Sequence, residues 1–212
     1  MLNVIIFSLT FIILFLLRLW LILPKQSKYN IQKRRTKACK TCIFLGSGGH
    51  TAEMLQLVKS LHPITYSPRS YIITNTDILS KEKAIEHENS LKKGKFDIYT
   101  IPRAREVGQS WLTVPKTVIV ALLASIRVML LSWPDLIICN GPGSCIPICM
   151  LAYLPRMLGI KKIEIIYVES FARVHTLSLT GKLLYLFVDR FLVQWPELSH
   201  RFNKAEYKGI LV

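Results

Sequence analysis

A strand, a glycine turn and a helix start follow one another in residues 41–61, and this succession constrains the fold more than any other feature of the sequence. Residues 41–45 form an apolar run of strand length, and the cluster Gly46-Ser47-Gly48-Gly49-His50 follows directly. Apolar residues then recur at helical spacing, at Met54, Leu55, Leu57, Val58 and Leu61. Glycines let a ligand approach the backbone closely, and the free N–H groups of a helix start carry partial positive charge. The turn is therefore suited to a phosphate or diphosphate.

The glycine spacing does not identify the ligand by itself. The segment Gly-Ser-Gly-Gly-His matches neither the Walker pattern nor the full dinucleotide fingerprint. A purely structural connection between strand and helix is an alternative for the turn, and a helix cap is an alternative for His50. A dinucleotide oxidoreductase is disfavoured, because no acidic residue after the second strand stands in a clear ribose-binding position, Asp77 being the nearest candidate.

The first 23 residues are apolar and have about the length needed to span a bilayer. The polar exceptions are Asn3, Ser8, Thr10 and Arg18. No small-residue cleavage pattern follows the apolar run, so an uncleaved anchor is favoured over a signal peptide. The basic residues come after the run, and the positive-inside rule therefore places the rest of the chain in the cytosol. Arg18 is expected to reach the lipid headgroups.

The chain is basic, with 28 Lys and Arg against 13 Asp and Glu and a formal net charge of +15. Such a charge suits nucleic acid, an anionic membrane surface or a phosphorylated substrate. Much of it lies directly after the anchor, at Lys25, Lys28, Lys33, Arg34, Arg35, Lys37 and Lys40. Tyr29 is the only aromatic residue among them, which argues against a stacking platform for nucleic acid. Residues 24–40 are predicted to form a basic juxtamembrane linker on anionic lipid.

The five cysteines fit reduced thiols in the cytosol better than a disulfide framework, because their number is odd and most lie in apolar runs. Cys39 and Cys42 have the spacing of a redox pair or of a zinc half-site, but no second Cys or His pair stands at metal-ligand distance from them. The sequence also lacks an Asp-x-Asp pair. No metal and no cofactor are expected.

Apolar strands alternate with helical segments over residues 41–212, the pattern of a doubly wound parallel sheet covered on both faces. The predicted strands after the first are 69–74, 96–101, 136–140, 162–168 and 190–193, and the predicted helices after the first are 81–93, 114–131, 146–158 and 180–188. Residues 114–131 are interrupted by polar side chains, which favours a buried or membrane-surface helix over a second span. Residues 194–197 are predicted to form a turn, and the tail from Tyr207 is too short for another domain.

Ligands of such sheets bind beyond the carboxyl ends of the strands. The special and polar segments of the sequence all fall at that edge: 46–50, 75–77, 102–111, 141–144 and 169–173. The loop with Arg103, Arg105 and Trp111 suits an anionic or sugar ligand, with an ordinary exposed loop as the alternative.

Four motifs in fixed order resemble one known family. They are Gly-Ser-Gly-Gly-His-Thr-Ala-Glu-Met at 46–54, Pro-Arg-Ala-Arg-Glu-Val-Gly-Gln-Ser at 102–110, Asn-Gly-Pro-Gly at 140–143 and Tyr-Val-Glu-Ser-Phe-Ala-Arg at 167–173. Together with the anchor they resemble the asparagine-linked glycosylation protein 14 family, the membrane-anchoring subunit of a split UDP-N-acetylglucosamine transferase. That family is similar to the acceptor half of the bacterial lipid II N-acetylglucosaminyltransferase, an enzyme with two Rossmann-like domains of the B type.

The resemblance implies a single Rossmann-like acceptor-binding domain over residues 41–212, held by the anchor at the cytosolic face of the endoplasmic reticulum. The lipid-linked acceptor would be N-acetylglucosaminyl-diphospho-dolichol. A separate soluble subunit would hold most of the UDP-N-acetylglucosamine, and the pair would form chitobiosyl-diphospho-dolichol with inversion. The chain is expected to be inactive alone, because it has the strands of only one of the two domains of a B-type enzyme.

The resemblance also assigns roles to residues. Inverting transfer needs a general base for the acceptor hydroxyl, and His50 is similar in position to the base proposed for the bacterial relative, with Glu169 and Asp77 as rivals. Backbone groups of the two glycine turns would hold the acceptor diphosphate; the residues concerned are Gly46, Ser47, Gly48, Gly49, Asn140, Gly141, Gly143 and Ser144. Asp77 is also assigned to the acceptor site. Arg103 and Arg105 would pair with phosphate or contact the partner.

Two other functions are compatible with the sequence. One is a split glycosyltransferase for exopolysaccharide, which would share the architecture and act on another lipid-linked acceptor. The other is a membrane scaffold that recruits a cytosolic protein without taking part in catalysis. Mutation of the glycine turns separates them, because a pure scaffold keeps its function and an acceptor site loses it.

Overall fold

The described residues form one parallel sheet preceded by a long apolar helix. The computed structural model describes residues 2–24, 37–105 and 108–211. Helix α1 (Leu2–Ile22) comes first. The strands are β1 (Thr41–Phe44), β2 (Arg69–Thr74), β3 (Phe96–Ile101), β4 (Leu136–Asn140), β5 (Glu164–Val168), β6 (Arg190–Val193) and β7 (Ala205–Tyr207). All neighbouring strands run parallel in the order β3-β2-β1-β4-β5-β6-β7. The predicted α/β class is confirmed.

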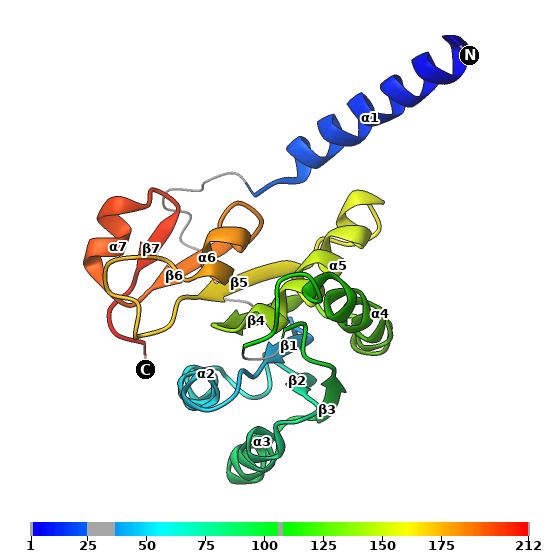
Figure 1. The fold of residues 1–212 in the computed structure, drawn as a ribbon. Coiled ribbons are helices and arrows are strands. Elements are labelled where there is room, and N and C mark those ends of the chain that lie inside the picture. The colour runs from blue at the N-terminus through cyan, green and yellow to red at the C-terminus, as the bar shows by residue number, and fades with distance from the viewer. Residues whose placement is uncertain (1, 25–36, 106–107, 212) are drawn as a thin grey trace.

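Helices cover both faces of this sheet, as Figure 1 shows, with α2 and α3 on one side and α4 and α5 on the other. Their bounds are α2 (Gly49–Lys59), α3 (Ile78–Leu91), α4 (Val114–Ser132), α5 (Ile146–Met157), α6 (Leu179–Leu184) and α7 (Pro196–Arg201), with a short 3-10 helix η1 (Gly143–Cys145) before α5. Alternate residues of β1 enter different cores: Cys42 and Phe44 pack in the core that includes α4 and α5, and Ile43 packs in the core that includes α2 and α3. This burial on both faces explains why the strands read as continuous apolar runs.

The C-terminal part of the chain differs from the sequence prediction. Instead of a turn over residues 194–197 followed by a tail, the structure has α7 and then β7, which extends the sheet beside β6. A strand of three residues carries too little periodicity to be found in the sequence. An ion pair between Arg190 Nη2 and Glu206 Oε2, at 2.6 Å, joins the two strands. Helix α6 also ends at Leu184, earlier than the predicted residue 188.

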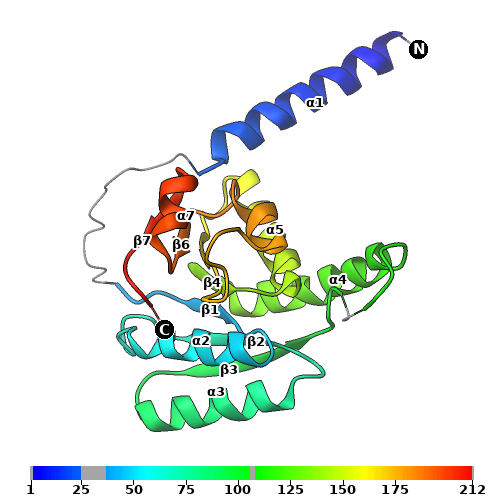
Figure 2. The same ribbon diagram turned by 60° about the vertical axis from the view of Figure 1, so that its left-hand side comes forward.

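Helix α1 extends away from the sheet and its helices (Figures 1 and 2). Among the described residues, Asn3–Ile22 and Val114–Ser132 are the helical stretches long and apolar enough to cross a membrane. The prediction that Arg18 reaches the lipid headgroups stays a prediction, but the structure gives the side chain a partner within the protein. Its guanidinium donates to the carbonyls of Met157 and Arg156, at 3.1 and 3.3 Å. The last carbonyls of a helix lack partners within it and carry partial negative charge, which makes a cation there favourable.

The predicted linker over residues 24–40 lies mostly outside the described residues, because residues 25–36 are not described.

Helix α4, in contrast, is fully described. It packs on the sheet through Ala121, Ser125, Val128 and Met129 and leaves apolar side chains exposed on its other face, at Ile119, Val120, Leu123, Ile126, Leu130 and Leu131.

Candidate functional site

The first glycine turn lies at the carboxyl end of β1 and leads into α2. Gly48 has a φ of 64°, in the left-handed region that glycine adopts readily. Helix α2 has no side-chain cap and no acidic residue in its first turn. A Cβ built on Gly48 or on Gly49 meets no atom of the described residues within 4 Å. The N-terminus of α2 therefore faces open space with free N–H groups, the arrangement that binds anions. Ser47 is exposed beside these glycines.

The second glycine turn, at the carboxyl end of β4, lies against the first. The Asn140 side chain donates from Nδ2 to the carbonyl of His50, at 3.0 Å. Gly141 has a φ of 68°, and a Cβ on it would lie closer than 3.0 Å to Cε1, Nδ1 and Nε2 of His50. A Cβ on Gly46 would similarly collide with Pro142. Because Gly46 and Gly141 have no side chains, the two turns can meet, and the imidazole of His50 packs directly against Gly141.

A carboxylate that the sequence reasoning missed lies next to His50. Glu53 Oε2 is 3.8 Å from His50 Nδ1, and the side chains of His50 and Glu53 are 33% and 18% exposed. Glu53 accepts from Asn140 Nδ2 at 3.3 Å and from Ser170 Oγ at 3.1 Å. His50 Nδ1 is itself buried and has no hydrogen-bond partner among the described residues. The buried Nδ1 of His50 thus faces the carboxylate of Glu53, and the side chains of Asn140 and Ser170 hold that carboxylate in place.

Glu169, predicted as a rival base, lies beneath the rim and not on it. Its side chain is completely buried. The carboxylate accepts from the backbone N–H and the hydroxyl of Ser178, at 3.0 and 3.1 Å, and from the N–H of Ser170, at 3.2 Å. Burial raises the pKa of Glu169, and these hydrogen bonds partly oppose the rise. The contacts give Glu169 the role of positioning the start of α6, whose cap is Ser178.

Asp77, the other rival base, caps α3. It accepts from the backbone N–H of Ser80 at 3.2 Å and from its hydroxyl at 2.5 Å. The hydroxyl of Ser80 in turn lies 2.5 Å from that of Thr51, which donates to the carbonyl of Gly46. Asp77 therefore belongs to a hydrogen-bonded chain that supports the first glycine turn from the side of β2.

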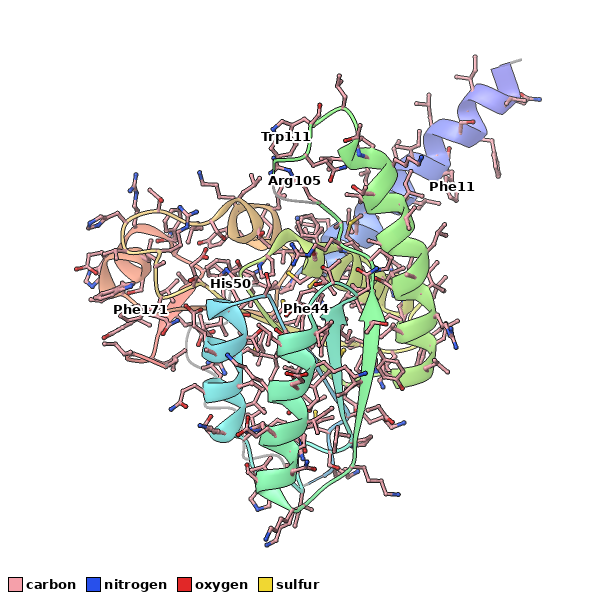
Figure 3. All side chains as sticks on the ribbon, turned by 60° about the horizontal axis from the view of Figure 1, so that its bottom comes forward. Phe11, Phe44, His50, Arg105, Trp111 and Phe171 are labelled. Atoms are coloured by element: carbon pink, nitrogen blue, oxygen red, sulfur yellow. The ribbon has the colours of Figure 1, made fainter. Side chains whose placement is uncertain are left out.

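The arginine loop after β3 is separate from His50. The guanidinium of Arg105 stacks on the ring of Trp111, 4.0 Å from its centroid. Figure 3 shows this pair at the N-terminal end of α4, apart from His50 and Phe171. Arg103 lies half-buried in the same loop, and Glu106 and Val107 of the predicted motif lie outside the described residues. Of the second turn, Gly143 is half-buried and Ser144 is buried. The structure thus brings together His50, Asn140 and Gly141, and Arg105 lies apart from them (Figure 3).

The chain resembles known proteins over most of its length. Residues 41–211 match a family described as oligosaccharide biosynthesis protein Alg14 like. UDP-N-acetylglucosamine transferase subunit alg14 of Schizosaccharomyces pombe is 53% identical over 174 residues, which cover 80% of this chain and 81% of that protein. The subunit ALG14 of Mus musculus is 40% identical over 223 residues, which cover 100% of both chains.

Among solved structures, MurG of Acinetobacter baumannii matches with a TM-score of 0.53 and 20% identity over 74% of this chain. A putative UDP-N-acetylglucosamine 2-epimerase of Listeria monocytogenes matches with a TM-score of 0.56 and 15% identity over 79% of this chain. The match spans 42% of each of those longer chains. At this identity the likeness concerns the fold: the chain has the fold of one part of these proteins.

Proposed function

The chain belongs to the Alg14-like family of oligosaccharide biosynthesis proteins, and on this premise we propose that it is the membrane-anchored, acceptor-binding subunit of a UDP-N-acetylglucosamine transferase. A soluble partner subunit holds most of the donor. The acceptor is N-acetylglucosaminyl-diphospho-dolichol at the cytosolic face of the endoplasmic reticulum, and the product is chitobiosyl-diphospho-dolichol. One observation carries the proposal: the imidazole of His50 is seated on Gly141 beside the uncapped N-terminus of α2.

His50 is the general base in this proposal. It takes the proton of the acceptor hydroxyl as that oxygen attacks the anomeric carbon of the donor sugar, and UDP leaves from the opposite face. With the substrates bound, Glu53 would accept from Nδ1–H, which would leave the lone pair on Nε2 for the substrate. The distance of 3.8 Å between Nδ1 and Oε2 is longer than a hydrogen bond, and we expect it to shorten when both substrates are bound.

The acceptor diphosphate is assigned to the two glycine turns. The free N–H groups of α2 lie at Gly49 and His50, where the helix begins. Their partial positive charge favours a diphosphate. Arg105 lies on another part of the rim (Figure 3). We assign Arg103 and Arg105 to phosphate or to the partner subunit. In this arrangement the reacting sugar is positioned between its own diphosphate and the base.

In this proposal the rim lies close to the membrane, and the exposed apolar surfaces of the chain support this. Helix α1 supplies the anchor, and the exposed apolar face of α4 lies on the same domain. Trp111 and Leu112 are 63% and 92% exposed at the start of α4, beside Arg105. Aromatic, apolar and basic side chains together are typical of a surface that contacts lipid headgroups. A lipid-linked acceptor would then reach the glycine turns without leaving the bilayer.

The proposal is tested by transfer of radiolabelled sugar from UDP-N-acetylglucosamine to a synthetic N-acetylglucosaminyl-diphospho-lipid. Membranes containing this chain are assayed with and without the soluble partner. Activity only with both subunits present supports the proposal. No activity with a bound and folded partner would contradict it. Activity on a different diphospho-lipid acceptor would instead favour the exopolysaccharide alternative, and unchanged function after mutation of the glycine turns would favour the scaffold.

Replacement of Glu53 by alanine is expected to lower turnover by about tenfold, because the base loses the group that orients it. The Michaelis constants of both substrates should change little, since Glu53 contacts His50, Asn140 and Ser170 and has no assigned role in substrate binding. Steady-state kinetics of the assembled complex check this. Glu82→Ala, an exposed glutamate of α3, is the matched control. An equal loss in both variants, or a change confined to the Michaelis constants, would contradict the role.

Replacement of Arg18 by leucine is expected to leave the chain in the membrane, because leucine is more apolar. Turnover on a long-chain acceptor in bilayers should fall by about threefold, the effect of losing a cation at a helix C-terminus. A short-chain acceptor in detergent should react normally, because its reaction does not depend on the distance between the rim and a bilayer. Lys83→Leu, at an exposed site of α3, controls for the loss of charge. Equal losses on both acceptors would rule out an effect on membrane placement.

A further inference from the structure

Three cysteines come together in the core directly below the second glycine turn. They are Cys139 in β4, Cys145 at the end of η1 and Cys149 in the first turns of α5, and their Sγ atoms all lie within 4.8 Å of one another. The sulfurs of Cys139 and Cys149 are 3.7 Å apart. All three side chains are buried, with exposures of 0%, 0% and 2%. We refer to these three residues as the trithiol cluster.

The local fold explains why the three sulfurs converge. Cys145 and Cys149 are four residues apart, so they stand on one face of the helical segment that starts at η1. That face packs on β4, where Cys139 belongs to the same core as Phe44 and Ile148. The sequence predicts no metal at Cys39 and Cys42, and the trithiol cluster is formed by other cysteines.

The spacing of the sulfurs suits coordination of one ion. Metal–thiolate bonds of about 2.3 Å hold three sulfurs about 4 Å apart around a central ion. The sulfurs of the trithiol cluster, 3.7 Å apart for one pair and at most 4.8 Å apart for the others, need only small shifts to adopt this arrangement. A disulfide needs a sulfur separation of about 2.05 Å and would leave the third thiol unused. Three soft sulfur donors select a soft, thiophilic ion.

The burial of the cluster limits the charge that such an ion can carry. Three thiolates around monovalent copper have a net charge of −2, and around Zn²⁺ a net charge of −1. Either charge would lie in a core with Phe44, Ile148 and Tyr167, where an uncompensated charge is costly. The N-terminus of α5 offsets only about half a charge. A trivalent ion forms a neutral complex with three thiolates and avoids this cost.

We propose that the trithiol cluster is a binding site for a trivalent thiophilic metalloid of the arsenic(III) class. Arsenous acid, As(OH)3, condenses with three thiols, forms three As–S bonds and releases three water molecules. Each thiol proton leaves in a water molecule with one hydroxide of the acid, and no atom changes its oxidation state. The bound ion ties β4 to the start of α5 on either side of the turn from Gly141 to Gly143.

The site is tested by titrating the full-length chain, in detergent, with sodium arsenite. We expect one arsenic atom per chain by elemental analysis and three sulfur neighbours by X-ray absorption. Cys149→Ala and Cys139→Ala should each weaken binding by at least about tenfold, because one of the three bonds is lost. Cys42→Ala is the matched control, since Cys42 is a buried thiol of β1 outside the trithiol cluster. Circular dichroism checks that each variant is folded.

Several results would overturn the site: no retained arsenic, two sulfur neighbours instead of three, equal affinity in Cys149→Ala and the unchanged chain, or tighter binding of Zn²⁺ than of arsenite. A second measurement rests on the proposed function. Arsenite should lower transferase turnover of the assembled complex, and Cys149→Ala should resist it. Arsenic binding is measured without substrate, so a failure of the proposed function leaves the binding result intact.

Discussion

Replacement of Gly141 by alanine is expected to lower turnover of the assembled transferase by about a hundredfold, the cost of displacing a reacting group by about 1 Å. The added Cβ would lie closer than 3.0 Å to three atoms of the His50 ring, so the ring must leave its seat on the second turn. The φ of 68° at Gly141 adds backbone strain for any side chain. Steady-state kinetics with both substrates measure the effect.

Two controls separate displacement of the ring from general damage. Gly159→Ala has a similar positive φ of 71° and carries the same kind of strain, but its Cβ would make only an ordinary contact with Arg18. We expect turnover to remain nearly normal in that variant. In a His50→Ala background, Gly141→Ala should have little further effect, because the ring that it displaces is absent. Independent, multiplying losses would contradict the account.

Most strands of the sheet could be predicted because their local sequence pattern is that of buried strands. Residues 69–74 and 136–140 are apolar runs bounded by turns, and the structure ends β2 and β4 at the predicted residues. Strand β7 could not be predicted, since three residues show no period and their pairing with β6 depends on the rest of the sheet already being formed. Local pattern therefore predicts central strands better than edge strands.

The site was harder to predict, because it depends on which way individual side chains point. Glu169 and Ser170 are adjacent just beyond β5, yet Glu169 enters the core and Ser170 donates to Glu53. Side chains alternate along an extended chain, so a shift of one residue exchanges these roles. Glu53 itself is an unremarkable helical glutamate in the sequence. Its contacts with Asn140 and Ser170 join positions 87 and 117 residues away, and only the folded sheet brings these together.

Replacement of His50 by alanine is expected to lower turnover by at least about tenfold while the complex still assembles, because a positioned base contributes a factor of 10²–10⁴ to proton transfer. Removing the ring also removes the neighbour that requires glycine at position 141, so the fold should tolerate the change. Binding of the partner and of the lipid-linked acceptor should persist, since both are assigned to other groups. Turnover and acceptor affinity are measured on the same preparation.

The comparison that decides the role of His50 uses His62→Ala, because His62 is an exposed histidine beyond the other end of α2. Turnover should remain normal in that variant. Near-normal turnover of His50→Ala would remove the base assignment and leave the ring as a packing group on Gly141. Asp77 would then be the rival to examine, because Glu169 is fully buried and engaged by Ser178. A large loss of turnover in His50→Ala together with a smaller loss in Glu53→Ala would instead match a base and the carboxylate that orients it. Removing the base abolishes its proton transfer, whereas removing the carboxylate only disturbs the orientation of the base.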